Sequence, residues 1–113
     1  ASAETIQQIM TELEKTPMDS LDYARSDTLY LEVFPKGANK GSAITAICEA
    51  LQIDPEKTIA FGDQELDIPM FKHAAFGVAM ANSPEHVKKC ADAVTLSNEE
   101  DGVAIALEQY VLN

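Results

Sequence analysis

Two acidic residues, Asp63 and Asp67, stand four positions apart directly after a short apolar run. The run at residues 59–61 is typical of a buried strand, and an apolar helical pattern resumes after Pro69. Acids at the carboxyl end of a buried strand lie where open α/β sheets bind ligands. If a helix opens at Gln64, Asp67 falls in its first turn, close to the Asp63 carboxylate.

Two converging carboxylates suit a hard cation such as Mg²⁺, either as joint ligands or as one ligand and one residue that orients it. The alternative is that Asp63 only caps the helix and that Asp67 is solvated, an arrangement common in α/β proteins. Gly62, between the strand and the acids, is expected to let the backbone turn tightly.

Lys40 stands at the predicted start of another helix, which we expect to be capped by Asn39 or Ser42. A cation there opposes the helix dipole, at a cost of about a few tenths of a kcal/mol. It becomes useful if the lysine and the free N–H groups face an anion together. A lysine that merely faces solvent is an equally open interpretation. Lys36 is the weaker candidate because it lies further from the helix start.

The elements that must position these residues alternate from residue 40 onward. Short apolar runs predict strands at residues 59–63, 77–80 and 92–96, with helices before, between and after them. Ser83 and Pro84 are typical of a helix start, as cap and first residue. An α-β-α-β-α-β-α order favours an α/β fold with a parallel sheet, helical cover and right-handed crossovers.

The preceding part has a different pattern. Residues 1–15 predict a helix with Ser2 as cap, and residues 18–34 alternate as a hairpin does, with a possible turn at residues 25–27. The predicted boundary is Pro35-Lys36-Gly37. Because the first helix begins almost at residue 1, we expect the chain to be cut from something longer. The apolar stripes expected on the first, second and last helices are Ile6, Ile9, Met10 and Leu13; Ala43, Ile44, Ile47 and Leu51; and Val103, Ile105, Ala106, Leu107 and Tyr110.

Composition narrows the classes of partner. The 113 residues make one domain at most, or part of one, and carry a net charge of −11. This charge argues against nucleic acid or anionic membrane as partner, but allows a phosphorylated substrate if a cation and a lysine neutralise the pocket. Cys48 and Cys90 are expected to be buried, free thiols, and the absence of a membrane-length apolar run makes the cytoplasm the default location. His73 and His86 are expected to be structural or exposed.

Four segments of the chain, taken in order, resemble motifs of one enzyme family. They are KGANKG at residues 36–41, IAFGDQELDIPM at residues 59–70, GVAMAN at residues 77–82 and SNEEDGVA at residues 97–104. Their order and spacing resemble the C-terminal part of Cof-type phosphatases, which are capped, class IIB members of the haloacid dehalogenase superfamily. The likeness covers nearly the whole chain and is closest to bacterial sugar phosphatases of that group.

The resemblance implies a fold and a division into domains. Residues 1–34 look like the C-terminal remnant of an α+β cap, namely its last helix and strands. Residues 35–113 look like the C-terminal half of a Rossmann-like parallel sheet, the core of this superfamily. The chain is therefore expected to be the C-terminal fragment of a longer phosphatase.

The resemblance also implies a reaction. Such enzymes hydrolyse small phosphorylated metabolites, and the likeness here implies sugar phosphates, through an aspartyl-phosphate intermediate with Mg²⁺. By this likeness Lys40 binds the phosphoryl oxygens and steadies the nucleophile, and Asp63 is the Mg²⁺ ligand. Asp67 supports either the water shell of the metal or Lys40, and Gly62 lets the strand end turn into the site.

Two departures from the family pattern bear on activity. The usual pattern at residues 62–67 is Gly-Asp-x-x-Asn-Asp, and its Asn contacts substrate phosphate, whereas Leu66 here cannot hydrogen-bond. Losing one neutral contact costs on the order of 1 kcal/mol. The Asp-x-Asp pair that supplies the nucleophile and the general acid occurs nowhere in the chain, nor does the Ser/Thr phosphate-binding motif. The isolated chain is therefore predicted to be inactive.

In the family fold, the missing first strand lies beside the strand from Thr58 to Asp63. Without it that apolar strand becomes an edge, and we expect the chain to self-associate there. The alternative function is a non-catalytic truncated module that associates with another chain, or that binds metal or phosphate only weakly. Leu66 and the missing nucleophile favour this alternative. A receiver-like signalling domain fits less well, because no acidic pair follows an early strand.

Overall fold

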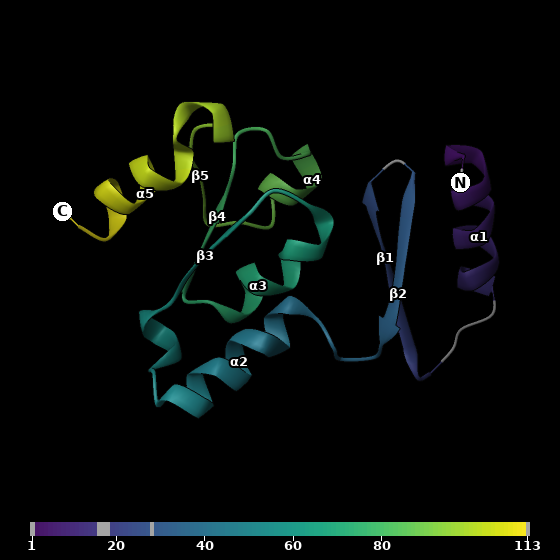
Figure 1. The fold of residues 1–113 in the computed structure, drawn as a ribbon, viewed down its shortest axis with the longest axis horizontal. Helices are drawn as coiled ribbons and strands as arrows, with labels where there is room; N and C mark the ends of the chain where they lie inside the picture. Colours follow the sequence, from purple (N-terminus) through teal and green to yellow (C-terminus); the bar gives the residue numbers. More distant parts are fainter. Residues whose placement is uncertain (1, 16–18, 28, 113) are drawn as a thin grey trace. The chain divides into compact units, whose positions relative to one another are not determined.

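The computed structural model describes residues 2–15, 19–27 and 29–112. The chain divides into two compact units, Ala1–Asn39 and Lys40–Asn113 (Figure 1). The sequence predicted a boundary near Pro35, a few residues earlier. The assignment of residues 1–34 to a cap and of residues 35–113 to a core stays a prediction.

The first unit begins with α1 (Ala3–Lys15), whose start is capped as predicted. The Thr5 N–H donates to the Ser2 hydroxyl at 3.2 Å. Ile6 is the fully buried member of the predicted stripe, whereas Ile9 is 43% exposed. Helical periodicity thus located the helix, but not how deeply each apolar residue is buried.

The predicted hairpin is confirmed as β1 (Leu21–Asp27) paired antiparallel with β2 (Tyr30–Pro35). The turn predicted at residues 25–27 is wrong, because β1 runs through Asp27, which pairs with Tyr30. The register shifts between Arg25 and Asp27. Cross-strand pairing therefore overrides the turn preference of these polar residues. The predicted start of the extended segment, Met18, lies outside the described residues.

The second unit has the alternating order that the sequence predicted. Its strands form a parallel sheet in the order β3-β4-β5. In chain order the elements are α2 (Lys40–Leu51), β3 (Ile59–Gly62), α3 (Ile68–His73), β4 (Phe76–Ala79), α4 (Glu85–Lys88), β5 (Ala93–Val94) and α5 (Gly102–Tyr110), with 3₁₀ turns η1 (Pro55–Lys57), η2 (Glu65–Asp67) and η3 (Asn98–Glu100).

Helices cover both faces of this sheet (Figure 1). Gly77 faces α3, since a Cβ there would lie 2.8 Å from the Phe71 Cβ. The next residue towards the strand start, Phe76, points to the opposite face and packs on Tyr110 of α5, with ring centroids 5.1 Å apart. The core on the α3 face contains Ala60, Phe71, Ala74, Ala79 and Val87.

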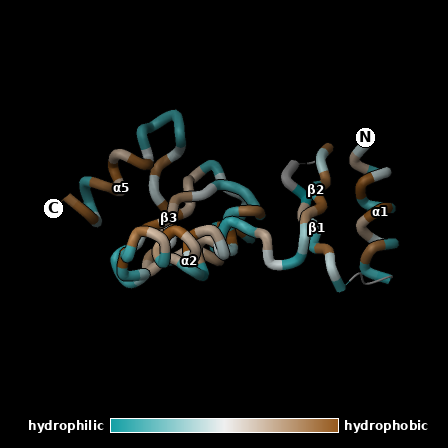
Figure 2. The backbone as a smooth tube through the Cα atoms, turned by 60° about the horizontal axis from the view of Figure 1, so that its bottom comes forward, coloured by the Kyte–Doolittle hydropathy of each residue, from teal (hydrophilic) through white to brown (hydrophobic). Residues whose placement is uncertain are grey.

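Several apolar side chains of the second unit are exposed, although the sequence pattern assigned them to buried stripes. On α2, Ile47 is 55% and Leu51 66% exposed, while Cys48 is buried as predicted. On α5, Val103 and Ile105 are each 40% exposed. Figure 2 shows the corresponding hydrophobic colour along both helices. Each helix therefore has apolar surface beyond the side that packs on its own unit.

The burial predicted for Cys90 is wrong. The helix α4 ends at Lys88, and Cys90 lies exposed in the turn beyond it. Its thiol donates to the His86 carbonyl oxygen at 3.3 Å. Both cysteines are free thiols. Among the described residues, no helix combines the length and apolar character needed to cross a membrane.

Candidate functional site

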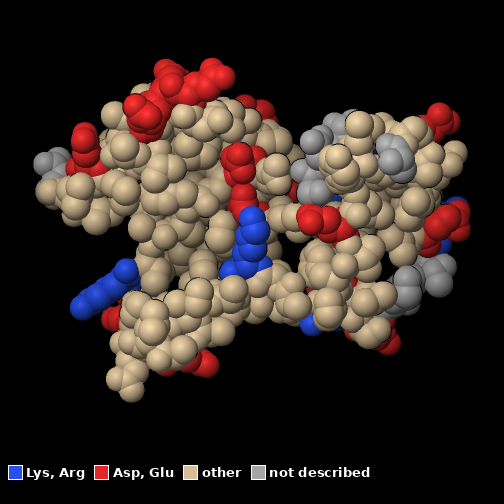
Figure 3. All heavy atoms as spheres, viewed as in Figure 1, with Lys and Arg blue, Asp and Glu red and all other residues tan. Residues whose placement is uncertain are grey.

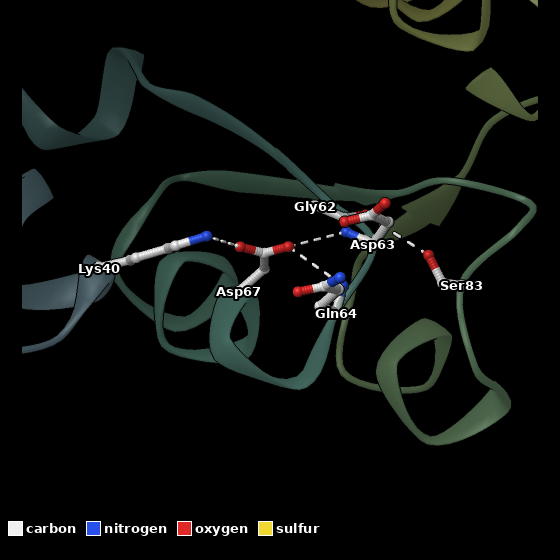
Figure 4. A network of polar contacts seen from close by, with 6 residues as sticks. All are labelled: Lys40, Gly62, Asp63, Gln64, Asp67 and Ser83. Atoms are coloured by element: carbon white, nitrogen blue, oxygen red, sulfur yellow. Dashed lines mark hydrogen bonds and ion pairs between the residues drawn. The ribbon is translucent and has the colours of Figure 1, made fainter. Parts of the chain in front are cut away.

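Asp67 is the centre of a polar network at the carboxyl end of β3 (Figure 4). One carboxylate oxygen, Oδ1, lies 2.5 Å from the Lys40 Nζ at the start of α2. The other, Oδ2, accepts the N–H groups of Asp63 at 2.9 Å and Gln64 at 3.1 Å. Asp67 is only 4% exposed. The predicted proximity of Asp67 to Asp63 is thus present, and the alternative of a solvated Asp67 is wrong.

Burial and hydrogen bonding act on the pKa of Asp67 in opposite directions. Burial raises this pKa, but the hydrogen bond from Lys40, the two backbone N–H donors and the positive charge of Lys40 together outweigh it. The net result is a pKa below the ordinary value of 3.8. Asp67 therefore stays ionised near neutral pH and keeps its hold on Lys40 and on the backbone at residues 63–64.

Lys40 is placed between the network and solvent. Its side chain is 54% exposed although its ammonium contacts Asp67. An ammonium has three donors, so the Asp67 contact leaves Lys40 able to bind a second anion. Figure 3 shows acidic side chains scattered over the drawn face, consistent with the net charge of −11. The exposed ammonium of Lys40 is a local positive charge that suits an anionic group.

Close packing at Gly41 accounts for the position of Lys40. A Cβ on Gly41 would lie 2.4 Å from the His73 Nδ1 and 2.5 Å from the Pro69 carbonyl oxygen. The missing side chain therefore lets the start of α2 pack directly on α3. The sequence analysis included Gly41 in the KGANKG motif at residues 36–41 but gave it no role of its own.

Asp63 follows β3 directly and has an exposed side chain. Its backbone N–H is bonded to Asp67, but in the described part of the chain its carboxylate makes no hydrogen bond or ion pair. The helix-cap alternative for Asp63 is wrong, since Gln64 occupies the cap position of η2. The free Asp63 carboxylate can thus bind a ligand.

The described residues contain no group of three or more His, Cys, Asp or Glu able to hold a metal ion. Asp63 alone still fits one position of a Mg²⁺ site, because Mg²⁺ commonly binds one or two carboxylates and completes its shell with water and substrate phosphate. Asp67 fits as a positioning residue, because both of its oxygens already accept hydrogen bonds.

Gly62 is required at the end of β3, but not for the reason expected from the sequence. Among the described glycines, only Gly37 has a positive φ, so no left-handed turn explains Gly62. A Cβ at Gly62 would instead lie 2.4 Å from the Asp67 Cβ. Gly62 thus makes room for the Asp67 side chain.

The helix-capping role predicted for Ser83 is wrong. Ser83 is 6% exposed, and its hydroxyl lies 3.5 Å from the Gly62 carbonyl oxygen, to which it donates a long hydrogen bond. Pro84 takes the cap position of α4. Ser83 thus joins the loop after β4 to the end of β3, a tertiary contact that local sequence patterns do not predict.

The other residues considered in the sequence analysis lie outside the hydrogen-bond network of Asp67. Leu66 lies half-buried in η2, beside Asp67, and its role in substrate binding stays untested. Lys36 belongs to the first unit. His73 and His86 are exposed as predicted, and the His73 Nδ1 lies 2.9 Å from the Pro69 carbonyl oxygen.

Comparison with known proteins identifies the family. A model of haloacid dehalogenase-like hydrolases matches residues 1–107. The chain is 39% identical to a 5-amino-6-(5-phospho-D-ribitylamino)uracil phosphatase of Bacillus subtilis, over 93% of this chain and 41% of that protein. It is 43% identical to a phosphoglycolate phosphatase of Methanopyrus kandleri, over 67% of this chain and 33% of that protein.

Solved structures agree with the sequence matches. A sugar phosphatase of haloacid dehalogenase subclass IIB superposes with a TM-score of 0.86 at 33% identity, over 96% of this chain and 41% of that chain. A haloacid dehalogenase-like hydrolase from Bacteroides thetaiotaomicron gives 0.76 at 38% identity, over the same shares of the two chains. The chain thus covers 41% of the length of each of these two structures. On sequence and fold together, the chain belongs to the haloacid dehalogenase-like hydrolase family.

Proposed function

We propose that this chain supplies the phosphate-binding lysine and the metal-binding carboxylate of a phosphatase that acts on small phosphorylated metabolites. The observation that carries the proposal is Asp67, which contacts the Lys40 ammonium with one carboxylate oxygen and the Asp63 backbone N–H with the other, while the Asp63 carboxylate stays free among the described residues. Related proteins are named as phosphatases of phosphoglycolate and of a phosphoribityl compound, and one is called a sugar phosphatase. Sugar phosphates are therefore the first substrates to test.

Each residue of the network has a distinct part in this proposal. Lys40 binds the phosphoryl oxygens with the donors that Asp67 leaves free, and so neutralises the charge that builds up on them. Asp67 acts as a positioning residue, since it holds both Lys40 and the backbone at Asp63. Asp63 contributes one oxygen ligand to Mg²⁺, which would supply further neutralisation of the phosphoryl group.

The nucleophile must come from outside these residues, since no Asp-x-Asp pair occurs in the chain. We propose that the whole protein supplies it and reacts through an aspartyl phosphate. The isolated chain is then inactive. A cytoplasmic location is part of the same proposal.

The test is phosphate release by a whole-length protein that contains this sequence, with sugar phosphates as substrates, with and without Mg²⁺. Lys40→Ala is expected to lower kcat/KM by about 10²-fold or more, the typical effect of losing one donor to developing charge. Asp63→Asn is expected to weaken activation by Mg²⁺. Lys72→Ala, on the exposed side of α3, is the matched lysine control. Full activity of Lys40→Ala would contradict the role of that lysine.

The second candidate is a non-catalytic module that associates with another chain or binds metal or phosphate weakly. Leu66, in place of the family asparagine, favours it. A folded whole-length protein that releases no phosphate from any substrate tested, yet shifts the NMR signals of Asp63 and Lys40 on addition of Mg²⁺ or phosphate, would support this second function.

A further inference from the structure

We propose that Ser83 is a positioning residue for Asp63 and acts through the peptide group that joins Gly62 to Asp63. The inference rests on the proposed function, because this positioning matters for the reaction only if Asp63 binds Mg²⁺. It adds a residue of the loop after β4 to a site whose other residues come from α2, from η2 and from the end of β3.

The peptide group that leads into Asp63 is hydrogen-bonded on both sides (Figure 4). Its carbonyl oxygen, which belongs to Gly62, accepts the Met80 N–H at 3.0 Å and the Ser83 hydroxyl at 3.5 Å. Its N–H, which belongs to Asp63, donates to the Asp67 carboxylate at 2.9 Å. The C=O and N–H of a trans peptide point in opposite directions, so these partners hold the peptide plane from opposite sides.

The orientation of this plane bears on the Asp63 side chain. The plane fixes the direction of the N–Cα bond, next to which the Cβ and the carboxylate branch. The following peptide is held as well, since the Gln64 N–H donates to the same Asp67 oxygen at 3.1 Å. The backbone on both sides of Asp63 is therefore fixed before a ligand binds. A group held in its bound orientation loses less freedom on binding, which favours affinity.

Ser83 supplies a donor from outside the sheet. The Met80 N–H only continues the pairing of β3 with β4, whereas the hydroxyl comes from the loop that follows. A carbonyl oxygen has two lone pairs and can accept both. Among the described residues, the Gly62 carbonyl is the one partner of the Ser83 hydroxyl. Because Ser83 is buried, water does not readily take over this bond.

The loop that carries Ser83 is itself anchored at two points. The Ser83 N–H donates to the Met80 carbonyl at 3.0 Å, which ties the loop to the end of β4. The neighbouring Asn82 Oδ1 accepts the Asn98 N–H at 3.2 Å, which ties it to η3. The hydroxyl is therefore a fixed donor and not one on a freely moving loop.

The same peptide connects Ser83 with the rest of the network. Asp67 accepts the Asp63 N–H with one oxygen and contacts the Lys40 ammonium with the other. A hydrogen bond to the carbonyl side of a peptide polarises its N–H, so the Ser83 hydroxyl strengthens the bond from Asp63 to Asp67. Loss of this hydroxyl should consequently affect Asp63 first and Lys40 less, which separates metal binding from phosphate binding.

The first measurement is NMR of the whole-length protein that contains this sequence, with and without Ser83→Ala. Gly-Asp occurs once in this chain, so ¹³C at the glycine carbonyl and ¹⁵N in aspartate mark this peptide within it. Ser83→Ala is expected to shift the Gly62 carbonyl signal and to speed exchange of the Asp63 N–H about two- to tenfold, the effect of one hydrogen bond. The Gln64 N–H is the internal reference, because it donates to the same Asp67 oxygen. Ser83→Thr keeps a hydroxyl and should restore both values.

The second measurement is the Mg²⁺ concentration that gives half-maximal phosphate release by the same protein. Ser83→Ala is expected to raise it about two- to tenfold. The kcat at saturating Mg²⁺ and the KM for the sugar phosphate should change less, because Lys40 keeps its contact with Asp67. Ser97→Ala is the matched control, since its hydroxyl donates to the Glu100 side chain at 3.0 Å and makes no bond to Gly62. This control should keep the unmodified Mg²⁺ dependence.

The results that overturn the inference differ from those that overturn the proposed function. An Asp63 N–H that responds to Ser83→Ala no more than the Gln64 N–H overturns the inference, and so does a Mg²⁺ dependence that changes no more than in Ser97→Ala. A Ser83 hydroxyl proton that exchanges as fast as that of an exposed serine also overturns it, and this measurement needs no variant. If the proposed function fails, Asp63→Asn instead leaves activation by Mg²⁺ unchanged, which refutes the metal role of Asp63 while the NMR response to Ser83→Ala remains.

Discussion

Replacing Asp67 by Ala should destabilise the second unit by about 2–3 kcal/mol. Two backbone N–H groups lose a charged acceptor, and each loss falls near the low end of about 1–3 kcal/mol because Asp63 and Gln64 are exposed and water can replace the carboxylate. The lost ion pair adds less than about 1 kcal/mol, since the Lys40 side chain is 54% exposed.

The assay is urea unfolding at pH 7, followed by far-UV circular dichroism, with Lys40→Ala as the matched variant. Lys40→Ala removes only the ion pair and should cost less than about 1 kcal/mol. Amide hydrogen exchange in the unmodified chain gives a second measurement that needs no variant, because the Asp63 and Gln64 amides should be protected despite the exposure of these residues.

Two results would refute this reasoning. One is an Asp67→Ala stability within about 0.5 kcal/mol of the unmodified chain, the range of ordinary surface substitutions. The other is a Lys40→Ala loss as large as that of Asp67→Ala, since the backbone contacts would then contribute nothing. Fast exchange of both amides would show that the hydrogen bonds to Asp67 are not maintained in solution.

Three further predictions follow from the same contacts. Folding lowers the pKa of Asp67, so the ionised carboxylate contributes to stability fully above the unfolded pKa of 3.8, and this contribution is lost as the pH falls through the lower folded pKa. Urea midpoints measured between pH 7 and pH 2 should show this loss of stability. The Asp67→Asn variant should not show it. Gly62→Ala should cost about 1–3 kcal/mol, because its Cβ would lie 2.4 Å from the Asp67 Cβ; an unchanged urea midpoint would mean that the loop yields freely. In the native chain a thiol reagent should modify exposed Cys90 quickly and buried Cys48 only on unfolding, and equal rates, measured by mass spectrometry, would contradict the burial assigned to them.

Much of the architecture could be predicted because it depends on local pattern. Apolar runs of strand length and helical stripes gave the correct α-β alternation from residue 40, and the short distance between Asp63 and Asp67 along the chain forced them into one turn. The hairpin and the cap at Ser2 are equally local. These features need only the periodicity of the backbone and the reach of a side chain to its near neighbours.

The errors involve residues whose surroundings come from distant parts of the chain. Ser83 has the local signature of a helix cap, but its hydroxyl donates to Gly62, which belongs to another strand. Cys90 continues an apolar pattern beyond the point where α4 ends. Gly62 is required by the volume of Asp67 rather than by backbone conformation.

In the candidate site, too, some features follow from the local sequence and others only from tertiary packing. The sequence by itself determined which residue types were available, namely a lysine at a helix start and two acids after a strand. Only the tertiary structure decided their contacts: Lys40 lies 2.5 Å from Asp67, while the Asp63 carboxylate has no partner among the described residues. The physical reason is that the packing of α2 on α3 at Gly41 brings together residues 27 positions apart in the chain, and no local pattern encodes that approach.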